Sequence, residues 1–187
     1  MKIKICGLSR KEDIAAANEA RPDYIGFVFA ESKRRVTFSR AAALRERLAP
    51  GITPVGVFVN APTNEIIALY RAGVIEIAQL HGGEGEAYIA ELPMPVIKAI
   101  KVHESRETCA DYLLLDSGKG SGRAFDWAQI GRIERPYFLA GGISLENMEE
   151  AMRYKPYAID VSSGAETGGL KDRAKIIALT EKVRRFS

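Results

Sequence analysis

The sequence predicts an α/β protein folded as a single (β/α)8 barrel over residues 1–187, with a fifth helix that is shortened or missing. Three observations lead to this prediction. Short apolar runs typical of strands alternate strictly with helical patterns, the alternation yields eight strands, and all of them fit into 187 residues. A doubly wound open sheet also alternates but usually has about five or six strands, so eight short strands favour a closed barrel.

The predicted strands share a short, mostly apolar run that stops at glycine, proline or a small polar residue. A continuous apolar run is what a strand covered on both faces requires. The eight runs are residues 2–6, 24–29, 55–59, 75–80, 96–100, 112–115, 137–140 and 157–161.

The segments between the strands carry helix signals. Ser9 could cap a helix over residues 10–20, and Ser39 the next, which runs to about Leu48. Only about ten residues follow Lys101 before the sixth strand, fewer than the dozen or so that a parallel crossover needs, so the fifth helix is expected to be very short or absent. The other helices are predicted over about residues 63–72, 84–92, 128–133, 145–154 and 170–186.

Composition limits the possible functions. The net charge is +3 with acids and bases interspersed, which gives no footprint for nucleic acid but suits an anionic small substrate. No run approaches the length of a membrane span, and the charged N-terminus does not resemble a signal peptide. The two cysteines, Cys6 and Cys109, do not suggest a disulfide framework, so the cytoplasm is the default compartment. Monomer and homodimer both stay open.

Two successive strands end in small residues. Residues 137–140 stop at Gly141 and Gly142, and residues 157–161 stop at Ser162, Ser163 and Gly164. Backbone N–H groups in such turns can approach a ligand closely and suit a phosphate. The alternative is two tight turns and a helix cap. Because the loops after strands seven and eight of such barrels commonly bind phosphate, we favour phosphate binding.

Other polar residues also fall at predicted strand ends, where such barrels hold their chemistry. Cys6 is either a buried apolar filler or an acid–base group. His81 is either structural or a substrate contact, and Asp160 is a further candidate for substrate binding. Asp126 follows a glycine-rich loop and could be a helix N-cap, a site residue or both. Asp116 either only holds that loop or belongs to the site.

Metal and nucleotide cofactors find no support in the sequence. The histidines and cysteines show no ligand spacing such as CxxC or HExxH. Neither a dinucleotide-binding nor a P-loop glycine pattern is present. We therefore expect neither a metal nor a cofactor.

Eight segments, in order and with plausible spacing, match one family: residues 4–8, 26–29, 32–36, 55–58, 79–82, 120–122 with 125–127, 139–142 and 160–164. They resemble phosphoribosylanthranilate isomerases. That resemblance implies a (β/α)8 barrel of tryptophan biosynthesis that converts N-(5-phosphoribosyl)anthranilate into 1-(2-carboxyphenylamino)-1-deoxyribulose 5-phosphate without a cofactor. The chain departs from the family pattern in a shortened region 101–111 and a shortened loop after Asp116.

The same resemblance implies roles for individual residues. Cys6 matches the general base and Asp126 the general acid. Arg34 matches the arginine that meets the anthranilate carboxylate, and the small residues after strands seven and eight match the phosphate cradle. The reaction is an Amadori rearrangement, which needs one acid and one base. A free thiol titrates near 8.5, so Cys6 needs something that lowers its pKa, and an iminium on the substrate could help.

Two other functions stay open as alternatives. The analogous aldose–ketose isomerase of histidine synthesis also uses a phosphate-binding barrel, but that family carries Asp at the first strand end, where this chain has Cys6. A barrel that binds a phosphorylated ligand without turnover would not need Cys6 together with Asp126.

Overall fold

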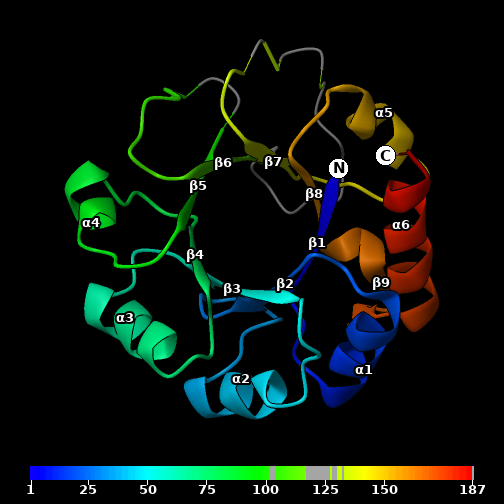
Figure 1. Ribbon diagram of the computed structural model, residues 1–187, viewed down its shortest axis with the longest axis horizontal. Helices are drawn as coiled ribbons and strands as arrows, with labels where there is room; N and C mark the ends of the chain where they lie inside the picture. The colour runs from blue at the N-terminus through cyan, green and yellow to red at the C-terminus, as the bar shows by residue number, and fades with distance from the viewer. Residues whose placement is uncertain (102–103, 117–126, 128–129, 132, 187) are drawn as a thin grey trace.

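A closed parallel barrel forms the centre of the molecule, which was obtained as a computed structural model describing residues 1–101, 104–116, 127, 130–131 and 133–186. Each strand pairs with the next, and β8 pairs back onto β1, so the sheet has no open edge (Figure 1). The strands are β1 (Lys2–Cys6), β2 (Tyr24–Val28), β3 (Thr53–Phe58), β4 (Ile77–Leu80), β5 (Val96–Ile100), β6 (Tyr112–Leu115), β7 (Tyr137–Leu139) and β8 (Ala158–Val161). The predicted fold class is confirmed.

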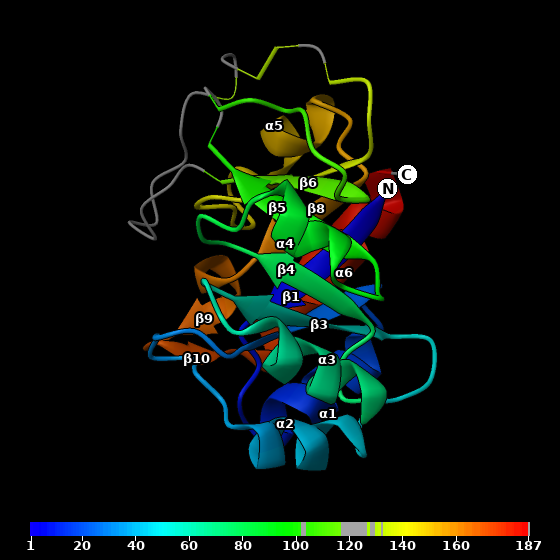
Figure 2. The ribbon, with the colours of Figure 1, turned by 90° about the vertical axis from the view of Figure 1, so that its left-hand side faces the viewer.

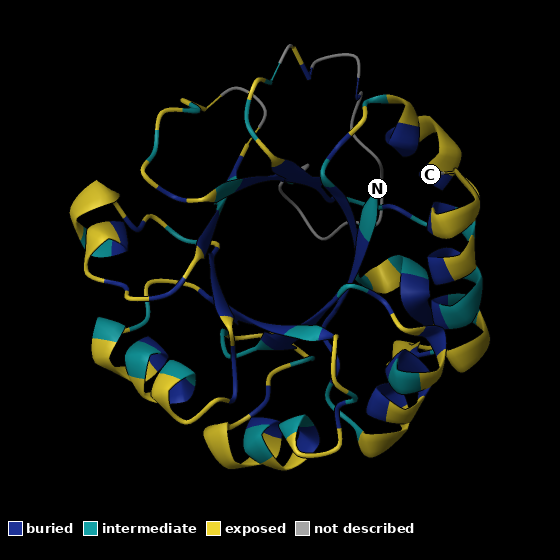
Figure 3. Ribbon diagram, in the orientation of Figure 1, coloured by how far each residue is buried: buried dark blue, intermediate teal, exposed yellow. Residues whose placement is uncertain are grey.

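The helices lie outside this ring, with one face buried against the strands and the other exposed (Figure 3). They are α1 (Lys11–Ala20), α2 (Phe38–Arg45), α3 (Thr63–Arg71), α4 (Glu86–Ala90), α5 (Met148–Arg153) and α6 (Arg173–Phe186). Between β5 and β6, the described residues 101 and 104–111 form no helix, as predicted. The helix expected over residues 128–133 lies largely outside the described residues. Among the described residues, no helix is both long and apolar enough to cross a membrane.

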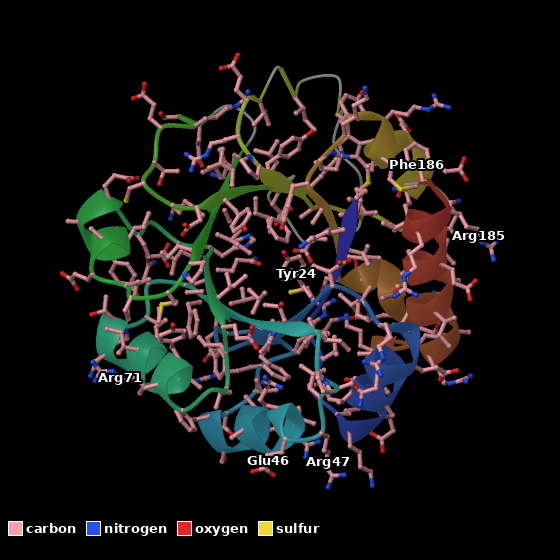
Figure 4. The ribbon with its side chains drawn as sticks, in the orientation of Figure 1. Tyr24, Glu46, Arg47, Arg71, Arg185 and Phe186 are labelled. Carbon is pink, nitrogen blue, oxygen red and sulfur yellow. The ribbon has the colours of Figure 1, made fainter. Side chains whose placement is uncertain are left out.

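Alternate positions of each strand point into the barrel, because successive side chains of a strand face opposite sides. Tyr24, Val55, Ile77, Leu114 and Phe138 belong to an apolar cluster inside the ring, separate from the larger cluster that includes the buried faces of the helices. Figure 4 shows Tyr24 within the ring, whereas Arg71 and Arg185 point away from it. The barrel interior is thus a packed core that can support polar side chains at its mouth.

Two predicted helix caps are wrong. Ser9 does not cap α1: the N–H groups of Ser9 and Arg10 donate to Oδ2 of Asp13, at 2.9 and 3.0 Å, and Arg10 is the N-cap residue. At α2 the cap is Thr37, not Ser39, because Thr37 has the extended backbone of an N-cap and its Oγ1 accepts from Arg40 N–H at 3.2 Å.

The last helix begins later than predicted, because residues 166–171 form a hairpin. β9 (Glu166–Thr167) and β10 (Leu170–Lys171) pair antiparallel around Gly168 and Gly169, whose φ values are 58° and 81°. Two successive residues with positive φ are typical of a type I′ turn, which glycine adopts without strain. The hairpin lies at the end of the barrel opposite the N-terminus (Figure 2), where the parallel strands finish.

Candidate active site

A pocket of about 200 Å³ opens at the carboxyl ends of the strands. Its lining includes the predicted residues Cys6, Arg34, His81, Asp160, Gly141, Gly142, Ser162 and Ser163. Residues that are far apart in the sequence therefore meet in one cavity. Gly164 does not line the pocket, and Asp126 lies outside the described residues, so the structure gives no position for the predicted general acid.

A larger cavity of about 540 Å³ lies on the outer surface between α5 and α6. Helix-surface side chains such as Glu149, Lys182 and Phe186 line it, and none of the predicted site residues that the structure describes is among them. We place the candidate active site in the smaller pocket, because that is where the strand-end groups capable of acid–base and anion-binding chemistry converge.

Cys6 ends β1 at the side of this pocket and is only 8% exposed. Burial raises the pKa of its thiol, and the ammonium of Lys4 opposes that rise without cancelling it. The thiolate that the sequence-based mechanism requires is therefore not the resting form of the ligand-free protein. The positive charge of Lys4 lowers the pKa of the Cys6 thiol and so favours the thiolate, although burial has the larger effect.

Lys4 precedes Cys6 by two residues, so both side chains face the barrel interior. Lys4 is fully buried, and its Nζ donates to both carboxylate oxygens of Asp160, at 3.1 and 3.0 Å. Although burial alone lowers the pKa of Lys4, Asp160 and Cys6 together raise it above its ordinary value. Lys4 is thus a fixed cation next to the thiol, and the carboxylate of Asp160 is already bonded within the protein.

Arg34 enters the pocket from the loop between β2 and α2. Its Nε and Nη2 donate to the two carboxylate oxygens of Glu166, at 2.5 and 3.0 Å. The stem of Arg34 crosses Gly7 so closely that a Cβ on that glycine would lie 2.4 Å from Arg34 Cδ. Gly7 also has a φ of 85°, which side-chain-bearing residues rarely adopt. Glycine is therefore the residue that allows Arg34 to lie where it does.

His81 sits between two polar side chains. Its Nε2 lies 3.1 Å from Asp116 Oδ2, and its Nδ1 lies 3.2 Å from Gln79 Nε2. A carboxylate only accepts, so Nε2 of a neutral ring carries the proton and Nδ1 accepts from the Gln79 amide nitrogen. Gln79 is 2% exposed and lines the pocket, and its Oε1 has no hydrogen-bond partner among the described residues. That oxygen is a buried acceptor that the described part of the chain leaves unused.

The loop that carries His81 is braced by Glu84, whose carboxylate accepts from the N–H groups of Asn60 and Gly82, at 2.7 and 2.9 Å. Lys98 Nζ donates to the same carboxylate at 2.9 Å. Burial alone would raise the pKa of Glu84, but the bonds from Lys98 and from the Asn60 N–H lower it. The position of His81 therefore depends on interactions between β3, β4 and β5.

The predicted phosphate residues lie on two loops that touch. Gly141 and Gly142 both have positive φ, and the side-chain amide of Asn147 donates to Gly142 O at 2.9 Å. On the other loop, a Cβ on Gly164 would lie 2.0 Å from the carbonyl oxygen of Ile143, so only glycine permits this approach. The two loops thus form one backbone-lined wall of the pocket, as a phosphate cradle requires.

Among the described residues, no group of three or more His, Cys, Asp or Glu side chains is arranged to hold a metal ion.

The family model for N-(5'phosphoribosyl)anthranilate (PRA) isomerase matches residues 3–182. This chain belongs to the phosphoribosylanthranilate isomerase family. A relative named N-(5'-phosphoribosyl)anthranilate isomerase in Endomicrobium trichonymphae is 44% identical over 98% of both chains. The crystal structure of the phosphoribosyl anthranilate isomerase from Thermus thermophilus superimposes with a TM-score of 0.90 at 35% identity, covering 100% of both chains.

A third similar protein was solved with a ligand. This phosphoribosyl anthranilate isomerase is in complex with reduced 1-(o-carboxyphenylamino)-1-deoxyribulose 5-phosphate and matches with a TM-score of 0.83, 30% identity and 99% coverage of both chains. Family membership confirms the predicted family and isomerase class. The roles of the individual residues stay predictions.

Sequence reasoning missed four residues that shape the pocket: Lys4, Gln79, Glu166 and Lys171. Lys4 and Gln79 carried a usable signal, because each is a polar residue at an inward position of a predicted strand, two residues before a strand-end candidate. Glu166 and Lys171 carried none: Glu166 fell between the eighth predicted strand and the last predicted helix, and Lys171 fell inside that helix, which was expected from about residue 170.

Proposed function

We infer that this chain isomerises N-(5'-phosphoribosyl)anthranilate to 1-(2-carboxyphenylamino)-1-deoxyribulose 5-phosphate by an Amadori rearrangement. The observation that carries this inference is the family match over residues 3–182. The pocket supports it, because it brings a thiol, an arginine and a glycine- and serine-lined wall together at the mouth of the barrel.

The chemistry divides into two proton transfers. A proton given to the ring oxygen opens the furanose to a cationic Schiff base, and removal of the C2′ proton then gives an enolamine that tautomerises to the ketone. We propose Asp126 as the acid, on the family resemblance, and Cys6 as the base, on the resemblance and its place in the pocket.

The thiol of Cys6 must lose its proton for this role. The buried ammonium of Lys4 supplies a permanent positive charge, but burial keeps the pKa of the free thiol raised. A Schiff-base cation on the bound substrate adds a second positive charge next to the sulfur. We therefore propose that the thiolate forms in the complex with the opened substrate rather than in the free enzyme.

Binding energy comes from groups far from the reacting carbons. The wall of Gly141, Gly142, Ser162 and Ser163 suits the phosphate, and Arg34 suits the ring carboxylate. We propose that Gln79 Oε1 accepts a hydroxyl of the sugar, with His81 and Asp116 fixing its orientation. Holding both ends of the substrate orients C2′ toward the base.

The test is turnover of phosphoribosylanthranilate generated in place, followed by the fluorescence of the anthranilate group, with no metal or cofactor added. We expect the fluorescence to fall with wild-type protein and to stay nearly constant with Cys6→Ala. Folded wild-type protein that leaves the signal unchanged, or that loses activity in a chelator, would show the inference to be wrong.

A further inference from the structure

Only one edge of the Arg34 guanidinium is bonded to Glu166. Nε and Nη2 donate to the two oxygens of Glu166 in a side-on fork. Neither Nη1 nor the second hydrogen of Nη2 is needed for that fork. Because Arg34 also lines the pocket, this second edge can take a second carboxylate in the same two-pronged way.

Glu166 is itself held in place. Lys171 Nζ donates to its Oε1 at 2.7 Å, and Lys33 Nζ lies 3.4 Å from its Oε2. Lys171 Nζ also donates to Ser162 O at 2.9 Å, so the same ammonium links the hairpin to the predicted phosphate wall. Opposed by burial, the bonds from Arg34 and Lys171 still lower the pKa of Glu166 to about 2. Glu166 is therefore a fixed carboxylate that stays ionised at neutral pH.

The charges of this cluster do not cancel. Lys33, Arg34 and Lys171 carry three positive charges around the single negative charge of Glu166, which leaves a surplus of two positive charges at the mouth. Glu166 therefore orders the cations without neutralising them. For an incoming carboxylate, this cluster is net positive even though it already contains one carboxylate.

From this geometry we propose that Glu166 is a positioning residue for substrate recognition. It locks the Nε edge of Arg34 so that the other edge faces the pocket and takes the ring carboxylate of the substrate. The proposal rests on the proposed function, because that function supplies the ring carboxylate. The hairpin of β9 and β10 thereby becomes part of the specificity machinery, with Lys171 holding Glu166 against the barrel.

If Glu166 competed with the substrate for Arg34 rather than positioning it, removing Glu166 would change the ligand affinity in the opposite direction. If Glu166 occupied Arg34 in place of the substrate, its removal would free the arginine and tighten binding. If it positions Arg34, its removal leaves a long, mobile side chain whose ordering cost falls on the substrate, and binding weakens. The direction of the change therefore separates the two roles.

The experiment compares two ligands: reduced 1-(o-carboxyphenylamino)-1-deoxyribulose 5-phosphate and the same compound without the ring carboxylate. Binding of each is measured by calorimetry to wild type, Glu166→Gln and Lys171→Met. For the ligand that bears the carboxylate, we expect both variants to bind about tenfold or more weakly, as a lost charged hydrogen bond implies. The ligand without it should bind wild type and Glu166→Gln alike. On Lys171→Met it should lose less affinity than the ligand that bears the carboxylate, because Lys171 also contacts Ser162 of the phosphate wall.

Glu31→Gln is the matched control, because Glu31 pairs with Arg35 in the same loop on the exposed surface. It should leave both affinities unchanged. Circular dichroism and thermal melting establish that each variant is folded. In an Arg34→Ala background, Glu166→Gln should have no further effect, since the residue it positions is gone.

Several outcomes would overturn the proposal. Tighter binding to Glu166→Gln makes Glu166 a competitor for Arg34, and unchanged binding removes it from recognition. An equal loss for both ligands means general damage to the pocket. Failure of the proposed function looks different, because wild type would then bind neither ligand and would not turn over phosphoribosylanthranilate.

Discussion

Lys4 Nζ lies 3.0 Å from Asp160 Oδ2 inside the barrel. Lys4 precedes Cys6 by two residues on β1. Lys4 and Asp160 are also register partners where β1 pairs with β8. One ion pair therefore lies at the seam that closes the barrel and supplies the positive charge nearest the proposed base. The first and last strands share a structural and an electrostatic role at this point.

Removing only one partner should be costly. Lys4→Met leaves the Asp160 carboxylate buried without its cation, and we expect a loss of about 3–5 kcal/mol in the free energy of unfolding. The double variant Lys4→Met with Asp160→Asn should recover much of that loss, because no unpaired charge is left. Urea unfolding of the three proteins measures both effects. If Lys4→Met unfolds with the same free energy as wild type, the ion pair does not stabilise the contact between β1 and β8.

The two cysteines should respond differently to substitution. Cys6→Ala should lower kcat by about 10²–10⁴, the usual contribution of a general base. Cys109→Ala is the control and should leave kcat nearly unchanged, because Cys109 is exposed beyond β5 and does not line the pocket. Full turnover by Cys6→Ala would remove Cys6 from the mechanism.

The raised pKa of Cys6 predicts how its thiol reacts with pH. In a Cys109→Ala background, alkylation should be slower at neutral pH than for an ordinary thiol and should rise about tenfold per pH unit toward the raised pKa, since only the thiolate reacts. The reduced product analogue should protect the thiol. A midpoint below that of a free cysteine would contradict the effect of burial. Mass-spectrometric rates between pH 6 and 10 provide the measurement.

Arg34 should contribute to binding through its forked geometry. Arg34→Ala should raise KM by the equivalent of about 1.5–3 kcal/mol, the range for hydrogen bonds to a charged group. Arg34→Lys should restore only part of this, because an ammonium cannot make two parallel bonds. Arg35→Ala serves as the neighbouring control, since Arg35 pairs with Glu31 on the surface. A normal KM for Arg34→Ala combined with a raised KM for Arg35→Ala would move the role to Arg35.

Gln79 should affect the reaction through its amide oxygen. Gln79→Leu removes both the acceptor for a sugar hydroxyl and the donor to His81 Nδ1, so we expect kcat/KM to fall about tenfold or more. Gln79→Glu keeps an acceptor in the same place and should retain more activity than Gln79→Leu. Equal activity of wild type and Gln79→Leu would exclude this contact.

Glu166 should make stability depend on pH in the acid range. Its pKa falls from an ordinary 4.5 to about 2 in the folded protein, so the folded state favours the carboxylate. The stability that it contributes is complete above pH 4.5 and is lost as the pH falls toward 2. Glu166→Gln should lack this component, so its stability relative to wild type should improve as pH falls through that window. Urea midpoints at several pH values test the sign, and parallel curves for the two proteins would refute it.

The sequence determined the barrel because its evidence is local and repeated. Apolar runs that stop at small residues located all eight strands. The short spacing after Lys101 indicated a reduced fifth crossover, whose described residues form no helix, since chain length alone limits a crossover. Where two local signals competed, the prediction failed: Ser39 and Thr37 both suit a cap, and residues 170–172 continue a helical pattern although Gly168 and Gly169 turn the chain into a hairpin.

The sequence by itself also determined which strand-end residues meet, because the carboxyl ends of parallel strands in a closed barrel lie at one mouth. It did not determine what those residues touch. The pairing of Lys4 with Asp160 and of Arg34 with Glu166 joins positions more than a hundred residues apart, and only closure of β8 onto β1 and the hairpin's approach to the β2–α2 loop brings them together. The raised pKa of Cys6 follows from burial within that closed assembly, so only the tertiary structure decides it.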